Sequence, residues 1–282
     1  MLSYFLDKAK KHLEENLDPK VKRRIETISR KNINAFGVDP FGFDPEILKW
    51  FAPIAVWFYR HYFRCAVTGV EHIPQGKMLV IANHSGQLPF DAMMIETAFL
   101  LEPKKPRVLR GMAERWSAEL PFVSTLFSRG GHVVGDPRTC KKLLEMGEGV
   151  MVFPEGVKGI NKLFNQRYQL IRFGHGFMRL ALQTGAPIVP VALVGAEEQA
   201  PAIANFVSLA KLFGAPALPL ILPQIVPLPL PTKYHIQIGK PLYFEGDGTE
   251  DNDIIAKYVQ QTKDVIQQML NEGVTKRKSV FF

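Results

Sequence analysis

A histidine and an aspartate stand seven positions apart, directly after a short apolar run. His84 and Asp91 belong to the segment NHSGQLPFD, which follows MLVIA (78–82) and precedes a helical pattern. An imidazole at the end of a strand can take a proton from a hydroxyl, while a carboxylate holds its other ring nitrogen as a donor. The residues therefore fit a general-base dyad. They also fit a plainer reading, in which Asp91 caps a helix and His84 is a loop histidine.

A second motif, Phe153-Pro154-Glu155-Gly156, follows the strand-like run GVMVF. Pro154 would end that strand, and Gly156 would let the chain turn or approach a ligand closely. We expect Glu155 at the same edge of the sheet as His84, because ligands bind at the carboxyl ends of strands in open α/β sheets. An ordinary turn with an exposed glutamate is the alternative. A third motif, APIVPV (186–191), puts Pro190 inside a strand pattern and predicts a sheet edge or a strand end there.

The elements that would position these residues alternate along the chain. Apolar, β-rich runs predict strands, and amphipathic stretches between them predict helices. The expected strands are 78–82, 107–110, 131–134, 149–153, 187–194 and 234–238, and the expected helices are 91–101, 138–146, 175–184 and 250–270. This order predicts an α/β fold with a central mixed, largely parallel sheet flanked by helices. Residues 1–45 are polar and predict an N-terminal helical extension.

We expect three regions: a helical region that could associate with a membrane (1–65), an α/β domain (66–245), and a C-terminal amphipathic helix with a basic tail (246–282). Thr249 is the expected N-cap of the last helix. Its expected buried face comprises Ile254, Ile255, Tyr258, Val259, Thr262, Val265, Ile266, Met269 and Leu270.

Charge points to an anionic partner without choosing one. The 282 residues hold 35 Lys and Arg against 27 Asp and Glu, a net charge of +8, which suits nucleic acid, anionic lipid or a phosphorylated substrate. No Asp or Glu occurs between Gly156 and Ala196, where five cations predict a positive field or simply a solvated face: Lys158, Lys162, Arg167, Arg172 and Arg179. A hydrophobic content of 46% excludes long-range disorder, and two cysteines exclude a disulfide framework or a cysteine zinc cluster.

Two apolar stretches bear on membrane contact. Residues 50–63 are rich in aromatic side chains but too short to span a bilayer, so they predict either an interfacial helix or a buried one. Residues 212–231 carry no charge, yet six prolines exclude an ordinary spanning helix. That stretch would cover the core, line an acyl groove or dip into a lipid interface.

Taken in order, the three motifs resemble the glycerolipid acyltransferase superfamily, which includes the PlsC-type lysophosphatidate acyltransferases. The resemblance covers roughly residues 66–245. It implies that His84 is the catalytic base, that Asp91 orients it, and that Glu155 and Gly156 form an acceptor-binding turn. Arg138, in GGHVVGDPRTCKK, and Lys158 are further acceptor-binding candidates. Six residues separate His84 from Asp91 where the family usually has four, and this longer form looks nearer to neutral-lipid and other bacterial members.

The resemblance implies transfer of a fatty acyl chain from acyl-CoA or acyl carrier protein to a glycerolipid hydroxyl, with no metal and no cofactor beyond that co-substrate. The partners would be this donor, the lipid acceptor and an anionic membrane surface, on the cytoplasmic side, with peripheral or monotopic attachment. Neutral-lipid acylation and a non-catalytic lipid-binding protein of the same fold are the alternatives. The sequence has no G-x-S-x-G motif, which a serine hydrolase would need for its nucleophile elbow, and none of the glycine-rich motifs of nucleotide-binding enzymes. It also has no recognisable nucleic-acid-binding module.

Overall fold

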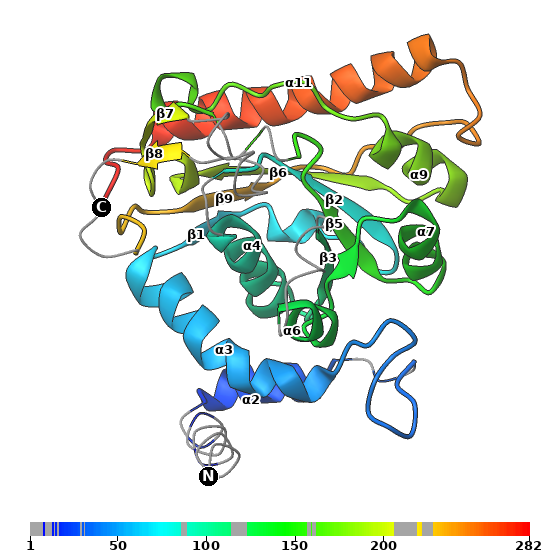
Figure 1. Ribbon diagram of the computed structural model, residues 1–282, viewed down its shortest axis with the longest axis vertical. Coiled ribbons are helices and arrows are strands. Elements are labelled where there is room, and N and C mark those ends of the chain that lie inside the picture. Colours follow the sequence, from blue (N-terminus) through cyan, green and yellow to red (C-terminus); the bar gives the residue numbers. More distant parts are fainter. Residues whose placement is uncertain are drawn as a thin grey trace.

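A seven-stranded sheet forms the centre of the computed structural model (Figure 1). The structure describes residues 8, 13, 15, 17–28, 30, 32–85, 89–113, 123–156, 159, 162–205, 219–221 and 228–282. The strands of the sheet are β1 (Ala66–Thr68), β2 (Met78–Ala82), β3 (Leu109–Ala113), β4 (Val133–Val134), β5 (Gly149–Val152), β6 (Ile188–Val194) and β9 (His235–Ile238). A separate antiparallel pair is formed by β7 (Ala202–Asn205) and β8 (Pro219–Ile221).

The strand order is β1-β9-β6-β2-β5-β3-β4. Strands β6, β2, β5, β3 and β4 run parallel, and β9 with β1 runs against them, because β9 pairs antiparallel with β6. The expected mixed, largely parallel sheet is therefore confirmed. Since β2 and β5 are parallel neighbours, the segments after them leave the sheet at the same edge.

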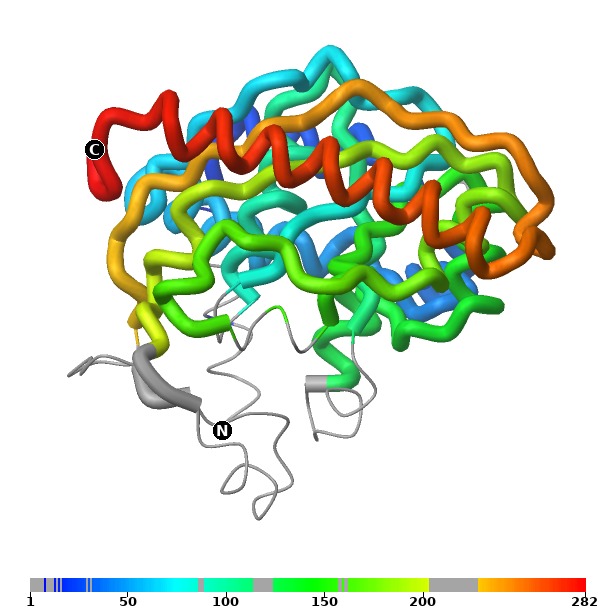
Figure 2. The backbone as a smooth tube through the Cα atoms, turned by 90° about the horizontal axis from the view of Figure 1, so that it is seen from above, coloured from blue at the N-terminus to red at the C-terminus, as the bar shows by residue number. Residues whose placement is uncertain are grey.

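Helices cover both faces of the sheet. The helices of the described residues are α2 (Pro19–Glu26), α3 (Leu48–Trp57), α4 (Phe90–Leu101), α6 (Val123–Arg129), α7 (Pro137–Glu145), α9 (Gly176–Thr184) and α11 (Asn252–Lys276). Of these, α4 packs on one face of the sheet, and α7, α9 and α11 pack on the other. A π-helical turn continues α3 over Phe58–Tyr62, and short 3₁₀ turns occupy Pro45–Ile47, Val70–His72, Phe164–Gln166 and Ala196–Glu198. Figure 2, seen from above, shows α11 lying across the near side of the molecule, over the strands.

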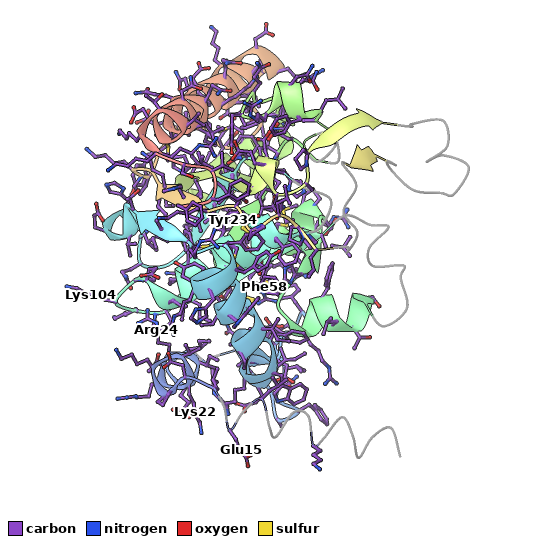
Figure 3. All side chains as sticks on the ribbon, turned by 90° about the vertical axis from the view of Figure 1, so that its left-hand side faces the viewer. Glu15, Lys22, Arg24, Phe58, Lys104 and Tyr234 are labelled. Atoms are coloured by element: carbon purple, nitrogen blue, oxygen red, sulfur yellow. The ribbon has the colours of Figure 1, made fainter. Side chains whose placement is uncertain are left out.

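Alternation along the strands divides the core into two layers. From β2, Leu79 and Ile81 join the apolar cluster under α7, α9 and α11, whereas Val80 and Ala82 join the cluster under α4. A third, smaller cluster packs α2 and α3 onto the end of α4. The guanidinium of Arg24 on α2 strengthens this contact by donating to the carbonyl of Leu100 at 2.7 Å and to that of Pro103 (Figure 3).

The polar N-terminal region is less helical than expected within its described part. After α2, residues 32–44 form turns rather than a helix. The carboxylate of Asp39 accepts hydrogen bonds from the main-chain N–H groups of Phe41 and Phe43. The side chains of Asn34 and Asp44 each accept the main-chain N–H of the residue two positions later in the sequence. Such local side-chain bonds compete with helical ones and favour turns.

Pro190 does not lie at a sheet edge or at the end of a strand, although the sequence pattern predicted one of these positions. It lies inside β6, which has β2 on one side and β9 on the other, so the prediction of an edge or strand end is wrong. The reason is that β9 ends at Ile238, opposite Val191. Beyond that point the N–H of Gly239 still donates to the carbonyl of Pro190 at 2.8 Å, and the proline has no N–H that needs an acceptor in return.

The last helix begins later and runs further than expected. It spans Asn252–Lys276 with Asp251 in the capping position, so Thr249 is not its N-cap. Thr249 instead donates its hydroxyl to Asp247 at 2.6 Å, within a turn closed by the carboxylate of Glu250. Ile254 is exposed, whereas the other expected core positions of the helix are buried or half-buried.

The aromatic segment at 50–63 has one buried side and one exposed side. Ala52, Val56 and Phe63 are buried against the domain, while Ile54 and Trp57 project from the opposite side of α3. Most of residues 212–231 lie outside the described residues; the described parts are β8 and 228–231. Among the described residues, no helix combines the length and apolar character needed to cross a membrane.

Candidate active site

His84 emerges at the carboxyl end of β2, in the middle of the sheet. The preceding residue, Asn83, fixes the exit of the chain from the strand: its side-chain amide donates to the carbonyl of Leu193 at 3.0 Å and accepts from the N–H of Leu193 at 2.8 Å. Because Leu193 belongs to the neighbouring strand β6, the chain is held at the point where it turns out of the sheet.

The structure brings His84 and Asp91 into direct contact. Nδ1 of His84 lies 2.6 Å from Oδ2 of Asp91, whose side chain is 0% exposed at the start of α4. The same oxygen accepts the N–H of Ser85 at 2.9 Å, and Oδ1 accepts the N–H of Ala92 at 2.8 Å. The carboxylate is therefore fixed on three sides, and the six residues between His84 and Asp91 leave it within reach of the ring.

The ring of His84 is held but not enclosed. It stacks on the ring of Phe153 at a centroid distance of 4.3 Å and an interplanar angle of 18°, and its side chain keeps 20% of its surface exposed. Since Nδ1 is engaged by Asp91, Nε2 is the nitrogen that can exchange a proton with another molecule.

Glu155 lies at the expected edge of the sheet, beside His84, but its side chain points inward. Its side chain is 0% exposed, which rules out the alternative of an ordinary turn with an exposed glutamate, and its carboxylate is engaged by the protein's own main chain. Oε1 accepts the main-chain N–H of His84 at 3.1 Å, and Oε2 accepts the N–H of Ile171 at 3.1 Å. Burial forces a carboxylate to find such donors, and here one of them belongs to His84 itself.

Gly156 gives the turn after β5 its shape. Its φ of 56° is left-handed, a conformation that glycine adopts without strain, and its N–H donates to the carbonyl of Phe153 at 3.0 Å. One turn later, Gly159 lies against the site: a Cβ there would come within 2.8 Å of the Cβ of Glu155 and 3.1 Å of the Cβ of His84. Only a residue without a side chain fits this approach.

Sequence reasoning missed two charged residues of this corner. Nζ of Lys162 lies 3.3 Å from Oε2 of Glu155 and 3.0 Å from Oε1 of Glu197. Burial raises the pKa of Glu197, and the ammonium of Lys162 opposes that rise. The only sequence signal was a lysine inside the acid-free run and a glutamate directly after it, and nothing in that spacing pairs them.

The acceptor-binding candidate Arg138 is not brought to His84. Arg138 is exposed at the first turn of α7, after β4, which lies three places from β2 in the sheet. At about 4.8 Å per strand, that places it on the order of 14 Å along the sheet from the dyad. Lys158 lies outside the described residues.

A cavity of about 290 Å³ opens beside α7 rather than at the dyad. Its lining is mixed, and the described residues that form it come from the first residues of α7, from α6 and from the ends of β3 and β4, with Phe41 from the N-terminal turns. Neither His84 nor Asp91 lines it. In the described ranges, no three His, Cys, Asp or Glu side chains gather as metal ligands would.

Glutamates from outside the acid-free run lie beside some of its cations in the folded protein. Lys162 is neutralised by two glutamates, and Arg167 lies 3.8 Å from a carboxylate oxygen of Glu198. Arg179 donates to the carbonyl of Gly248 at 2.6 Å and to Asn252 at 2.9 Å. The predicted positive field is therefore reduced at Lys162 and Arg167, because glutamates from before and after the run fold onto them, whereas Arg179 is bonded to neutral acceptors and keeps its charge.

The comparisons with known proteins fit this arrangement. A model of the acyltransferase family matches residues 64–194, which contain His84, Asp91, Glu155 and the β6 motif. The chain belongs to the glycerolipid acyltransferase superfamily. The acyltransferase is 38% identical over 258 residues to an uncharacterized protein of Mycobacterium tuberculosis, covering 88% of this chain and 72% of that protein.

More distant relatives carry a named activity. A probable 1-acyl-sn-glycerol-3-phosphate acyltransferase of Mycoplasma pneumoniae is 24% identical over 178 residues, which are 60% of this acyltransferase and 63% of that protein. The crystal structure of the 1-acyl-sn-glycerophosphate acyltransferase PlsC from Thermotoga maritima aligns with a TM-score of 0.54 at 20% identity, covering 83% of each chain. This second likeness shows that the two proteins share the α/β fold.

Proposed function

We propose that this acyltransferase moves a fatty acyl chain from a thioester, acyl-CoA or acyl carrier protein, to a hydroxyl of a glycerolipid such as lysophosphatidate. The observation that carries the proposal is the 2.6 Å contact between Nδ1 of His84 and Asp91, on a ring that remains partly exposed at the carboxyl edge of the sheet. A thioester is already activated, so the reaction needs a base for the hydroxyl but no nucleophile from the protein.

In the proposed reaction, Nε2 of His84 takes the proton of the acceptor hydroxyl as its oxygen attacks the thioester carbonyl. Asp91 keeps the proton on Nδ1 and stabilises the imidazolium that forms. The tetrahedral intermediate then collapses, the carbon–sulfur bond breaks, and the leaving thiolate recovers the proton from Nε2. An ester and a free thiol result, and His84 is neutral again.

The acceptor is proposed from the superfamily, with a neutral lipid as the second candidate. The phosphate ligand expected from the family would be Arg138, and its distance along the sheet from His84 favours testing monoacylglycerol, diacylglycerol and fatty alcohol beside lysophosphatidate. Release of CoA from a long-chain acyl-CoA by purified protein, measured with each acceptor in turn, decides between them. His84→Ala is the control, and release without any acceptor, or liposome binding without transfer to any of them, would contradict the proposal and favour a hydrolase or a lipid-binding protein.

We also propose that the enzyme works at the cytoplasmic face of a membrane as a peripheral or monotopic protein. Ile54 and Trp57 on α3 are 47% and 51% exposed. The ring of Trp57 lies 5.8 Å from that of Tyr62, whose hydroxyl donates to the carbonyl of Pro229, between the exposed Leu228 and Leu230. These side chains would form one apolar surface for the lipid interface.

Cations that keep their charge accessible could add attraction to anionic lipid. Lys22 and Lys104 project from the outer side of the molecule, from α2 and from the segment after α4 (Figure 3). Vesicle flotation tests the apolar surface: Trp57→Ser with Leu228→Ser should weaken binding to anionic vesicles by about tenfold. Phe36→Ser is the matched control, because Phe36 is 91% exposed on the N-terminal turns, and an equal loss in that variant would contradict the assignment.

A further inference from the structure

Lys162 stands between two buried carboxylates at the back of the candidate active site. Its Nζ lies 3.3 Å from Glu155 and 3.0 Å from Glu197, and its side chain is 5% exposed. Glu155 and Glu197 come from opposite ends of the acid-free run, so the lysine joins the turn after β5 to the turn after β6. Together the three groups carry a net charge of −1.

The carboxylate of Glu155 binds two main-chain N–H groups. One oxygen accepts the N–H of His84 and the other that of Ile171. A carboxylate accepts such N–H groups more strongly than a neutral carboxyl does, because a hydrogen bond to a charged acceptor is roughly twice as strong as one between neutral groups. The anchor on His84 is therefore strongest when Glu155 carries its charge.

Two carboxylates without a cation would not both stay ionised in such a place. Burial and mutual repulsion would drive one of them to take up a proton, since desolvated like charges in one site cannot be held together cheaply. Lys162 removes that conflict. Glu197 in turn uses its other oxygen to accept the N–H of Tyr168 at 2.9 Å, which ties the same lysine to the loop beside the site.

We propose that Lys162 is a positioning residue for acyl transfer: by compensating Glu155 and Glu197 it keeps the carboxylate that holds the main chain of His84. This inference rests on the proposed function of His84 as the base. Its effect on the reaction passes through Glu155 to the backbone of His84, and a small displacement of that ring would misalign the proton transfer.

The test uses the full chain with three variants. Lys162→Met removes the cation and keeps a similar stem, Glu197→Gln removes the second carboxylate, and the double variant removes both. Lys257→Met, on the exposed side of α11, controls for the loss of one positive charge. Thioester-dependent acyl transfer gives kcat and KM for each protein, and circular dichroism checks that each is folded.

The proposal expects Lys162→Met to lower kcat by about ten- to a hundredfold with KM nearly unchanged, because the ring is displaced while the acceptor surface is not. Adding Glu197→Gln should restore most of that loss, since Glu155 then remains the only buried carboxylate of the three. A purely structural lysine would predict that the two substitutions add. Wild-type kcat in Lys162→Met, or a folded double variant no faster than Lys162→Met, would overturn the proposal.

A second readout does not depend on turnover. The chain has seven histidines, so selective ¹⁵N-histidine labelling gives few main-chain amide signals, and His84→Ala identifies that of residue 84. This amide proton should move upfield in Lys162→Met, as its bond to a charged carboxylate weakens, and return in the double variant. If the signal behaves in this way but no acceptor is ever acylated, the proposed function fails and the positioning contact stands; an unmoved signal contradicts the contact itself.

Discussion

Two clusters of buried charge lie at the edges of this fold, and they differ in what they hold. The base cluster comprises His84, Asp91, Glu155, Lys162 and Glu197; the anchor cluster comprises Asp39, Glu96, Arg110 and His132. In the base cluster, carboxylates accept main-chain N–H groups and leave one imidazole partly exposed. In the anchor cluster, the guanidinium of Arg110 is 1% exposed and donates to Asp39 at 2.6 Å and to the carbonyl of Gly131 at 2.7 Å.

The comparison shows that buried ion pairs and hydrogen bonds can position a reactive side chain in one region and hold two segments together in another. The anchor cluster fastens the N-terminal turns to β3, with the ring of Phe43 under Arg110 at 5.0 Å. Nη2 of Arg110 and Nδ1 of His132 are buried without a hydrogen-bond partner among the described residues, so this cluster is less completely satisfied. We therefore expect changes in the base cluster to alter the rate, and changes in the anchor cluster to alter stability.

The largest effect is expected at Asp91. Asp91→Asn keeps the size of the side chain but removes the charge that favours a proton on Nδ1 and stabilises the imidazolium. We expect kcat for acyl transfer to fall by about a hundred- to ten-thousandfold, while the free energy of unfolding changes little by comparison. Steady-state kinetics measures kcat, and urea unfolding of the same preparation measures the free energy of unfolding. A variant with normal kcat would remove the basis for treating the pair as a dyad.

Arg110→Met should have the converse effect. It leaves the carboxylate of Asp39 buried without its cation, and breaking a buried ion pair from one side typically costs about 3–5 kcal/mol of unfolding free energy. The turnover of the folded fraction should stay near the wild-type value. Denaturant unfolding measures the first quantity, and the double variant Asp39→Asn with Arg110→Met should recover part of the loss. An unchanged midpoint in Arg110→Met would mean that the anchor cluster does not hold the N-terminal turns.

The smallest effect is expected from His132. Burial lowers the pKa of this ring, but Glu96, at 3.1 Å from Nε2, raises it by more, so the pKa is raised overall. A pKa raised in the folded state stabilises the protein below the unfolded value of about 6.5 and loses that contribution as pH rises through the folded value. Wild type should therefore lose up to about 1 kcal/mol of stability between pH 6 and 8, and His132→Gln should lose less. Parallel curves for the two proteins would contradict this.

The sequence predicted the local parts of both the fold and the site. The alternation of apolar runs predicted the strands β2, β5, β6 and β9 and the helices α4, α7 and α9 to within a residue, because each pattern is read within one element, whereas β3 ends three residues later than expected. The approach of His84 to Asp91 was also accessible, since both belong to one strand–turn–helix segment. Pro190 and Thr249 were misread because their bonding depends on where a neighbouring strand or turn ends.

The partners of the buried charges could not be read in this way. Lys162 meets Glu197 across 35 residues, and Arg110 meets Asp39 across 71. These pairings depend on how the crossover connections place the chain, and many other cations in the sequence had the same local appearance. The same reason explains Glu155: its position at the edge beside His84 followed from the strand order, but the use of its carboxylate on the backbone did not.

The central claim is that the exposed imidazole of the base cluster carries the chemistry while the anchor cluster does not. Its most direct test is the single-turnover rate of acyl transfer from a long-chain acyl-CoA to the preferred acceptor, measured for wild type, His84→Ala and Asp39→Asn under conditions where all three are folded. We expect a loss of at least about a hundredfold in His84→Ala and a rate close to wild type in Asp39→Asn. A His84→Ala protein that transfers the acyl chain at the wild-type rate would contradict it.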